Sequence, residues 1–72
     1  MNYSFDLCLI REKRMFKGYS MQKMADLLGL ESKSMYYKRE TGNTQFKATE
    51  IPVLASLLDI PVEKIFVKTL RK

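Results

Sequence analysis

Signals that start and stop helices recur at short intervals along the chain, and they limit every helix to a few turns. Ser20 is a favourable N-cap residue, and Gly29 is a favourable residue just past a helix C-terminus. The segment between them predicts a helix of roughly two turns. Its apolar residues recur at helical spacing, which leaves the polar side chains on the opposite face. The pattern indicates an amphipathic helix on the surface of a small domain.

Similar signals predict four more helices. Ser4 can cap a long helix that runs to Gly18 with no proline or glycine inside it. Proline lacks an N–H group and is tolerated only in the first turn, so each of the two prolines marks a helix start. The predicted starts are Ser4, Ser20, Ser32, a position near Thr49, and Pro61. Because no segment alternates like a β-strand, we predict an all-α fold, a compact five-helix bundle.

The length of 72 residues predicts a single domain over residues 1–72, because two halves would each bury too little surface to fold alone. Apolar residues make up 46% of the chain and charged residues 29%, which is a globular balance and not the signature of disorder. We expect one small core and a basic tail over residues 67–72.

The chain has one cysteine and no histidine, which removes several kinds of chemistry. A disulfide within the chain is impossible, and a transition-metal site lacks its usual ligands. The most frequent general base is also absent, and no Ser, Asp or Lys cluster has the spacing of a nucleophile and its base. We therefore predict a protein that is not an enzyme and needs no cofactor. Cys8 is expected to be a small buried apolar residue.

Charge and hydropathy restrict the partners. No apolar run approaches the roughly 18 residues of a membrane span, and the N-terminus does not resemble a signal peptide. We expect a cytoplasmic protein without a membrane partner. Thirteen Lys and Arg against eight Asp and Glu give a net charge of +5, which favours a polyanion. Nucleic acid is the first candidate.

The segment "SKSMYYKRE" predicts a helix capped by Ser32 that has two different sides. At 100° per residue, Lys33, Ser34, Tyr37 and Lys38 fall on one side, and Met35, Tyr36 and Arg39 fall on the other. Tyr36 is expected to pack inward and Tyr37 to point outward. Short polar, aromatic and basic side chains near a helix N-terminus suit the DNA major groove. An ordinary solvated helix face is the alternative.

The middle of the chain resembles the Cro and phage-repressor type of helix-turn-helix domain, the XRE family, over residues 10–66. The segment "IREKRMFKGYS" is similar to the first helix and turn, and "MADLLG" is similar to the second helix. "KSMYYKRETG" is similar to the recognition helix, and "EIPVLASLLDIPVEKIF" to the last two helices. The resemblance implies a lambda-repressor-like DNA-binding domain with its helix-turn-helix at about residues 20–41.

The resemblance also implies roles for individual residues. Arg14 would pair with Glu40 and so join the first helix to the recognition helix. Double-stranded operator DNA is the implied partner, read at its bases by Lys33, Ser34 and Tyr37 and held at its phosphates or periphery by Gln22, Ser32 and Lys38. Two positions depart from the family pattern. Met21 stands where the family usually has Gln, and the turn "GLES" is one residue longer than the family's Gly-x-Ser.

Small phage proteins of this family suggest two functions. One is a Cro-like transcriptional regulator that binds operator DNA in the switch between lysogenic and lytic growth, within the bacterial host cell. The other is an antirepressor, or modulator of repression, that binds the phage repressor protein. Spare apolar residues on the first and fourth helices favour a protein contact, although tail residues or an irregular core could cover them. The candidates for this interface are Phe5, Leu9, Phe16, Val53 and Leu57. The sequence leaves open whether the chain forms a homodimer.

Overall fold

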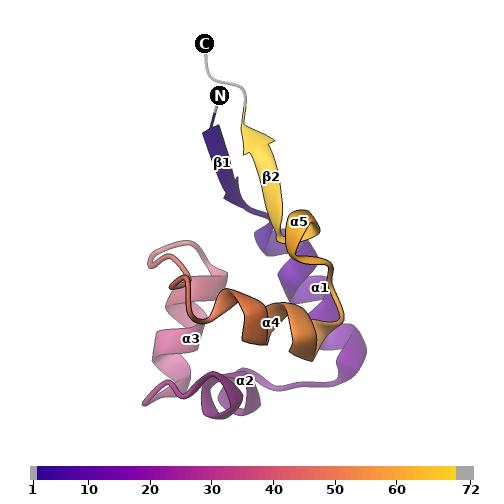
Figure 1. The fold of residues 1–72 in the computed structure, drawn as a ribbon. Helices are drawn as coiled ribbons and strands as arrows, with labels where there is room; N and C mark the ends of the chain where they lie inside the picture. The colour runs from indigo at the N-terminus through magenta and orange to yellow at the C-terminus, as the bar shows by residue number, and fades with distance from the viewer. Residues whose placement is uncertain (1, 70–72) are drawn as a thin grey trace.

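Five helices and one pair of short strands form the described part of the chain (Figure 1). The computed structural model describes the backbone of residues 2–69 and the side chains of residues 4–67. In chain order the elements are β1 Asn2–Phe5, α1 Leu7–Lys17, α2 Met21–Leu28, α3 Lys33–Glu40, α4 Ile51–Leu58, α5 Val62–Ile65 and β2 Phe66–Thr69. The mostly helical, all-α fold is the one that the capping signals predict.

The caps of α2 and α3 lie where the sequence places them. The Ser20 hydroxyl accepts a hydrogen bond from the Lys23 amide at 3.0 Å, and the Ser32 hydroxyl accepts one from the Met35 amide at 3.3 Å. Gly29 ends α2 in the left-handed conformation with φ of 75°, which costs glycine little because it has no Cβ. Local sequence therefore determines both ends of α2 and the start of α3.

The N-terminal segment differs from the prediction. The first helix does not begin at Ser4: it begins at Leu7, and the Asp6 carboxylate caps it by accepting a hydrogen bond from the Leu9 amide at 3.1 Å. Ser4 and Phe5 belong to β1, which pairs antiparallel with β2 so that Phe5 lies opposite Phe66. The expectation that the chain has no strand was wrong, because this pairing joins two segments far apart in sequence and a local pattern does not reveal it.

The C-terminal segment also differs in detail. α5 is a single turn that follows Pro61, and its first residue Val62 is 48% exposed. Residues 67–69 of the predicted basic tail belong to β2, and residues 70–72 lie outside the described residues. The Asp6 amide donates to the Ile65 carbonyl at 2.6 Å, so the start of α1 is tied to the end of α5.

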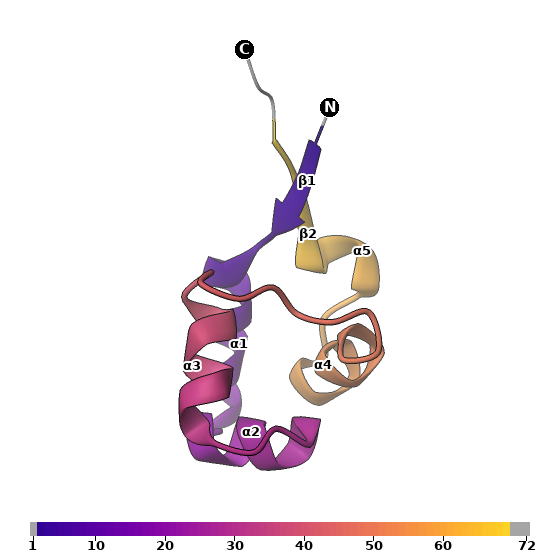
Figure 2. The same ribbon diagram turned by 90° about the vertical axis from the view of Figure 1, so that its left-hand side faces the viewer.

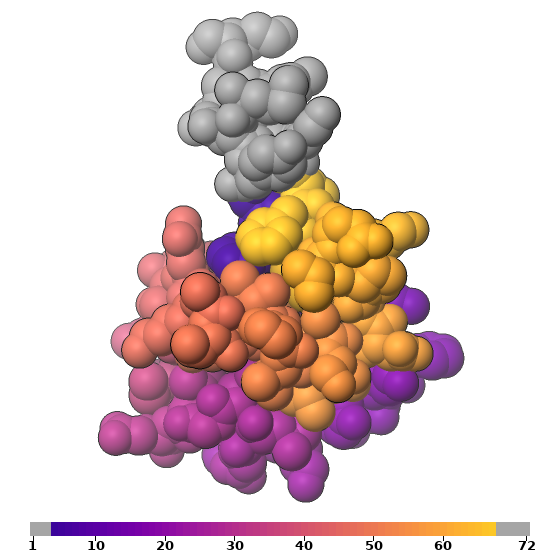
Figure 3. Space-filling view, viewed as in Figure 1, coloured from indigo at the N-terminus to yellow at the C-terminus, as the bar shows by residue number. Residues whose placement is uncertain are grey.

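The core lies between α1, α2, α3 and α4. Figure 2 shows α3 standing beside α1, with α2 crossing near the N-terminal end of α3 and α4 on the opposite side. The connection from α3 to α4, residues 41–50, has no regular structure but contributes Phe46, which is 5% exposed. The Phe46 ring packs edge-on against Tyr36 and Phe5 at centroid distances of 6.3 and 5.4 Å. In Figure 3 this connection and α4 lie across the front of the helical body.

The buried apolar residues form one cluster that draws on every helix. Its members are Ile10, Met24, Ala25, Tyr36, Phe46, Leu54, Ala55, Leu58, Ile60 and Ile65. Within the described part of the chain, no helix is long and apolar enough to cross a bilayer.

Candidate nucleic-acid interface

α3 has one exposed side and one buried side, divided as the helical spacing predicts. Lys33, Ser34 and Lys38 are exposed, and Tyr37 is 51% exposed. On the other side Tyr36 is completely buried, and the charged residues Arg39 and Glu40 are 4% and 5% exposed. The exposed side is therefore a continuous polar, aromatic and basic surface on a helix whose other side is held by the core.

Glu40 joins α3 to α1 through the expected ion pair with Arg14. Arg14 Nε donates to Glu40 Oε2 at 2.8 Å, and Arg14 Nη2 donates to Glu40 Oε1 at 3.2 Å. The remaining terminal nitrogen, Nη1, donates to the Tyr19 carbonyl at 2.9 Å, in the segment between α1 and α2. One guanidinium group thus connects α1, the segment between α1 and α2, and α3, with the planar two-point geometry that arginine and a carboxylate favour.

The Tyr36 hydroxyl completes this network. It donates to Glu40 Oε2 at 2.7 Å from one turn earlier on the same helix. Burial raises the pKa of Tyr36 far above its usual value, and the hydrogen bond and negative charge of Glu40 raise it further, against a smaller opposite effect of Arg14. Tyr36 is therefore protonated across the physiological range and remains a donor to the carboxylate.

A second buried ion pair was not foreseen from the sequence. Arg39 Nε donates to Glu50 Oε1 at 2.8 Å, with the two side chains 4% and 8% exposed. The helical spacing predicted that Arg39 lies on the inner side of α3, but it did not indicate which acidic residue would pair with it. The available signal was that a buried arginine requires a counter-charge, and Glu50 is one of several acidic residues in the chain.

Two of the predicted phosphate contacts, Gln22 and Ser32, lie at the N-termini of α2 and α3. The Ser32 hydroxyl accepts the capping hydrogen bond from Met35, which leaves its O–H free to donate to another acceptor. Gln22 is exposed, and its side-chain nitrogen donates to the Asp26 carboxylate at 3.1 Å, so a phosphate contact would replace this hydrogen bond. Met21 is half-buried and packs against the core, so of these two neighbouring residues Gln22 is the one whose side chain is exposed.

The longer turn between α2 and α3 keeps the two helices together. The Leu30 amide donates to the Ala25 carbonyl at 2.8 Å, and the Leu30 side chain packs against the core. Glu31, the next residue, is exposed. α2 and α3 pack directly on each other, so the four residues 29–32 connect the helices without separating them.

The candidate protein-contact residues divide into two groups. Phe5, Leu9 and Leu57 are half-buried and pack against the core, whereas Phe16 is 84% exposed and Val53 is 41% exposed. Met15, which is not among the predicted interface residues, is 61% exposed beside Phe16. Cys8 is exposed on α1, not buried as expected, because the face of α1 that meets the core carries Ile10. An apolar surface thus remains at the C-terminal end of α1.

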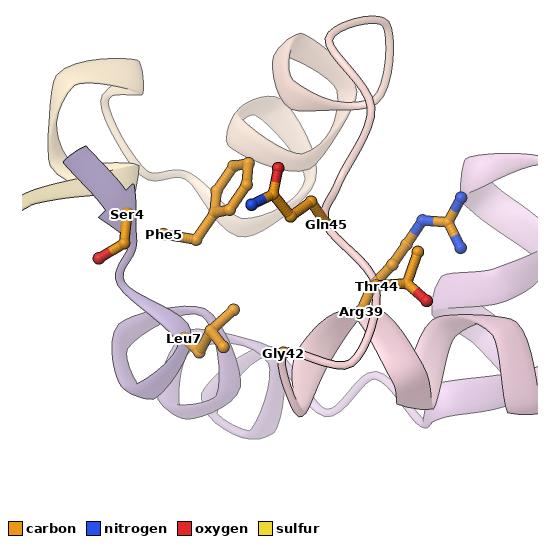
Figure 4. Close-up of a pocket in the computed structure, with 7 residues that line it drawn as sticks. All are labelled: Ser4, Phe5, Leu7, Arg39, Gly42, Thr44 and Gln45. Atoms are coloured by element: carbon orange, nitrogen blue, oxygen red, sulfur yellow. The ribbon is translucent and has the colours of Figure 1, made fainter. Parts of the chain in front are cut away.

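A cavity of about 240 Å³ lies between the start of α1 and the residues that follow α3 (Figure 4). The Arg39 guanidinium already binds Glu50, and the rest of the lining is apolar or neutral, so the cavity offers no reactive group. The lining residues are Ser4, Phe5, Leu7, Arg39, Gly42, Thr44 and Gln45. Among the described side chains, no three His, Cys, Asp or Glu residues lie together as metal ligands would.

Comparison with known proteins identifies the family. The family model for helix-turn-helix domains matches residues 10–65, which is most of the chain and extends from within α1 to the end of α5. Neither the comparison with curated proteins nor the comparison with solved structures gives a significant match. The matched family consists of DNA-binding regulators and not of enzymes. With α2 and α3 as its helix-turn-helix, the chain belongs to the Cro and phage-repressor type of helix-turn-helix domains, the XRE family.

Proposed function

We propose that this DNA-binding regulator reads operator DNA with the exposed side of α3. The observation that carries the proposal is the division of α3 into a solvent-facing polar surface and a buried side that is fixed by ion pairs. A recognition helix needs both properties, because its side chains must reach base edges while its backbone stays in one orientation. The net charge of +5 supplies a general attraction to DNA.

Each exposed residue has a role that fits its chemistry. Ser34 and Tyr37 carry hydroxyl groups that can donate to or accept from base edges, and Lys33 can donate to guanine acceptors. Lys38 lies in the last turn of α3 and contacts phosphate, together with Ser32 and Gln22 at the helix N-termini. Base contacts select the sequence, and phosphate contacts fix the position of the domain on the duplex.

Gel-shift assays with the DNA that flanks the gene for this chain test the proposal. We expect Ser34→Ala and Tyr37→Ala to reduce discrimination between this DNA and unrelated competitor DNA. Phe16→Ala is the matched control for Tyr37→Ala, because it removes an exposed aromatic ring from α1. If both α3 variants keep the affinity and the sequence preference of the wild type, this side of α3 does not read DNA.

The regulatory setting that we propose is a phage genetic switch, with the chain acting as a Cro-like regulator in the bacterial cytoplasm. Its support is the residue pattern of the phage-repressor type, which extends over both halves of the domain. A reporter gene placed under the flanking promoters measures whether expression of the chain changes transcription and in which direction. No response of any flanking promoter would contradict this setting.

A second candidate function is an antirepressor that binds the phage repressor. It is favoured by the exposed pair Met15 and Phe16, since neighbouring apolar side chains at 61% and 84% exposure are available for a protein contact. In this function Tyr37 would be the desolvated anchor on the repressor, and Lys33 and Lys38 would steer the encounter.

Size-exclusion chromatography of the chain mixed with the repressor separates the two candidates. A shared peak, together with release of the repressor from its operator, supports the antirepressor. Two unshifted peaks with unchanged repressor binding to DNA contradict it. Tyr37→Ala and Phe16→Ala then show whether α3 or α1 carries the contact. The elution volume of the chain alone tests for the homodimer.

A further inference from the structure

We propose that Arg39 and Glu50 are positioning residues that set the orientation of the recognition helix α3 against the second half of the domain. The inference rests on the proposed function, because it assigns the ion pair a part in sequence discrimination. It concerns a different contact from the Arg14–Glu40 pair, which joins α3 to α1.

The geometry of the pair is two-pronged and almost completely buried. Arg39 Nε lies 2.8 Å from Glu50 Oε1, and Arg39 Nη2 lies 3.1 Å from Glu50 Oε2. The third nitrogen, Nη1, donates to the Met35 carbonyl one turn earlier at 3.3 Å, which holds the guanidinium plane against α3. Glu50 Oε1 also accepts the Lys47 amide at 3.0 Å. Both ends are therefore held by further hydrogen bonds, so the pair has one favourable arrangement.

The position of Glu50 in the chain determines which elements the ion pair connects. Glu50 occupies the N-cap position of α4, but its side chain makes no capping hydrogen bond to α4. The carboxylate instead reaches back to Lys47 and to Arg39. The ion pair thus joins the last turn of α3 directly to the N-cap residue of α4, at the far end of the connection at 41–50.

Few other contacts connect α3 to α4. α3 packs extensively on α2 and more lightly on α1, and α4 is not among its main packing partners. Phe46, within the connection, packs edge-on against Tyr36, but this contact joins α3 to the connection and not to α4 itself. The Arg39–Glu50 pair therefore adds a directional polar link between α3 and the start of α4 to the apolar packing of the shared core.

The two neighbouring ion pairs act from different sides of α3. Arg39 and Glu40 are adjacent, so their side chains leave the helix about 100° apart around its axis. Glu40 is held by Arg14 of α1, and Arg39 is held by Glu50 at the start of α4. One link alone permits α3 to rotate about that link, whereas two links at different angles fix the rotation.

A positioning role differs from a stabilising role, because a buried ion pair often stabilises no more than an apolar pair of similar volume. Three variants of the chain distinguish a positioning role from a stabilising role. Arg39→Lys keeps the charge but loses the two-pronged geometry. Glu50→Gln keeps an acceptor but loses the charge. The double variant Arg39→Met with Glu50→Leu restores an uncharged, packed contact and controls for stability.

The main measurement is discrimination between the flanking operator DNA and single-base variants of it, at a temperature where circular dichroism shows every protein folded. We expect both single variants to lower the discrimination ratio by about tenfold, the scale of one good base contact. The double variant should match or exceed the single variants in thermal stability but keep the lowered ratio. Wild-type discrimination in the single variants, or in the double variant, would overturn the positioning role.

Amide hydrogen exchange of α3 without DNA is the second measurement. We expect Arg39→Lys and Glu50→Gln to speed exchange in the last turn of α3 and leave α1 unchanged. If the wild-type chain itself does not distinguish DNA sequences, the proposed function fails, and the exchange data alone decide the positioning role. Faster exchange confined to α3 then supports it, and unchanged exchange overturns it.

Discussion

Similar residues have different roles on the two sides of α3. Tyr36 and Tyr37 are neighbours in the sequence, but Tyr36 is completely buried and Tyr37 is 51% exposed. The lysines of the exposed side have no ion-pair partner among the described salt bridges, whereas Arg39 and Glu40 on the buried side each bind an opposite charge on another element. Position around the helix, and not residue type, therefore decides which side chains hold the fold and which meet a partner.

This difference predicts that changes on the two sides have separable consequences. The buried side consists of groups that satisfy one another, so removal of one leaves others unpaired. The exposed side consists of groups that solvent already satisfies, so removal of one changes folding little. Variants on the buried side should affect stability, and variants on the exposed side should affect binding.

The largest expected difference is between the two tyrosines. Tyr36→Ala should lower the free energy of unfolding by ~3 to 5 kcal/mol, because it empties a buried aromatic site and also removes one of the hydrogen-bond donors to Glu40. Tyr37→Ala should change it by less than about 0.5 kcal/mol. Urea unfolding of both variants measures the difference. Equal unfolding midpoints would contradict the division of α3 into two sides.

A smaller loss is expected when the link to α1 is cut. Glu40→Ala removes the acceptor of Arg14 and Tyr36 and should cost ~1 to 3 kcal/mol. A double-mutant cycle with Arg14→Ala isolates the pair, and the two losses should not add, because each single change already breaks the same contact. Thermal melts in which Glu40→Ala matches the wild type would remove the structural role of this ion pair.

The pH dependence of stability tests the buried side of α3 through Tyr36. The folded-state pKa of Tyr36 lies above its unfolded value of about 10, so folding favours the protonated phenol. This contribution is fully present below pH ~10 and is lost as the pH rises further. Between pH 10 and 11 the wild type should lose about 1 kcal/mol more unfolding free energy than Tyr36→Phe. Parallel slopes of the two proteins would contradict the coupling.

Much of the helical framework could be predicted from local sequence. The caps at Ser20 and Ser32 and the turn at Gly29 depend on residues within one helical turn, so a local pattern contains the information. The division of Tyr36 from Tyr37 follows from the helix period for the same reason. The Arg14–Glu40 pair was implied by family resemblance and not by the residues alone.

The remaining features depend on contacts between distant segments. The pairing of β1 with β2 joins the two ends of the chain and replaces the first turn of the predicted α1. Phe46 is buried from a connection without regular structure, and Glu50 turns its side chain away from the helix that it begins. A periodic pattern indicates which side of a helix or strand faces inward, but not which residue of another segment contacts that side. These contacts could therefore be identified only in the folded structure.

The smallest expected effect on folding, and the sharpest test of the exposed side, comes from Lys38→Ala. Its unfolding free energy should stay within about 0.5 kcal/mol of the wild type, because the side chain is exposed. If Lys38 contacts a phosphate, its loss should weaken binding to all DNA sequences by a similar factor and reduce the slope of log affinity against log salt by about 1. Lys64→Ala, which removes an exposed lysine from α5, is the matched control and should leave the slope unchanged. Fluorescence anisotropy at several salt concentrations measures both variants. Altered sequence preference in Lys38→Ala would place this side chain in the groove, and an unchanged slope would remove it from the DNA contact.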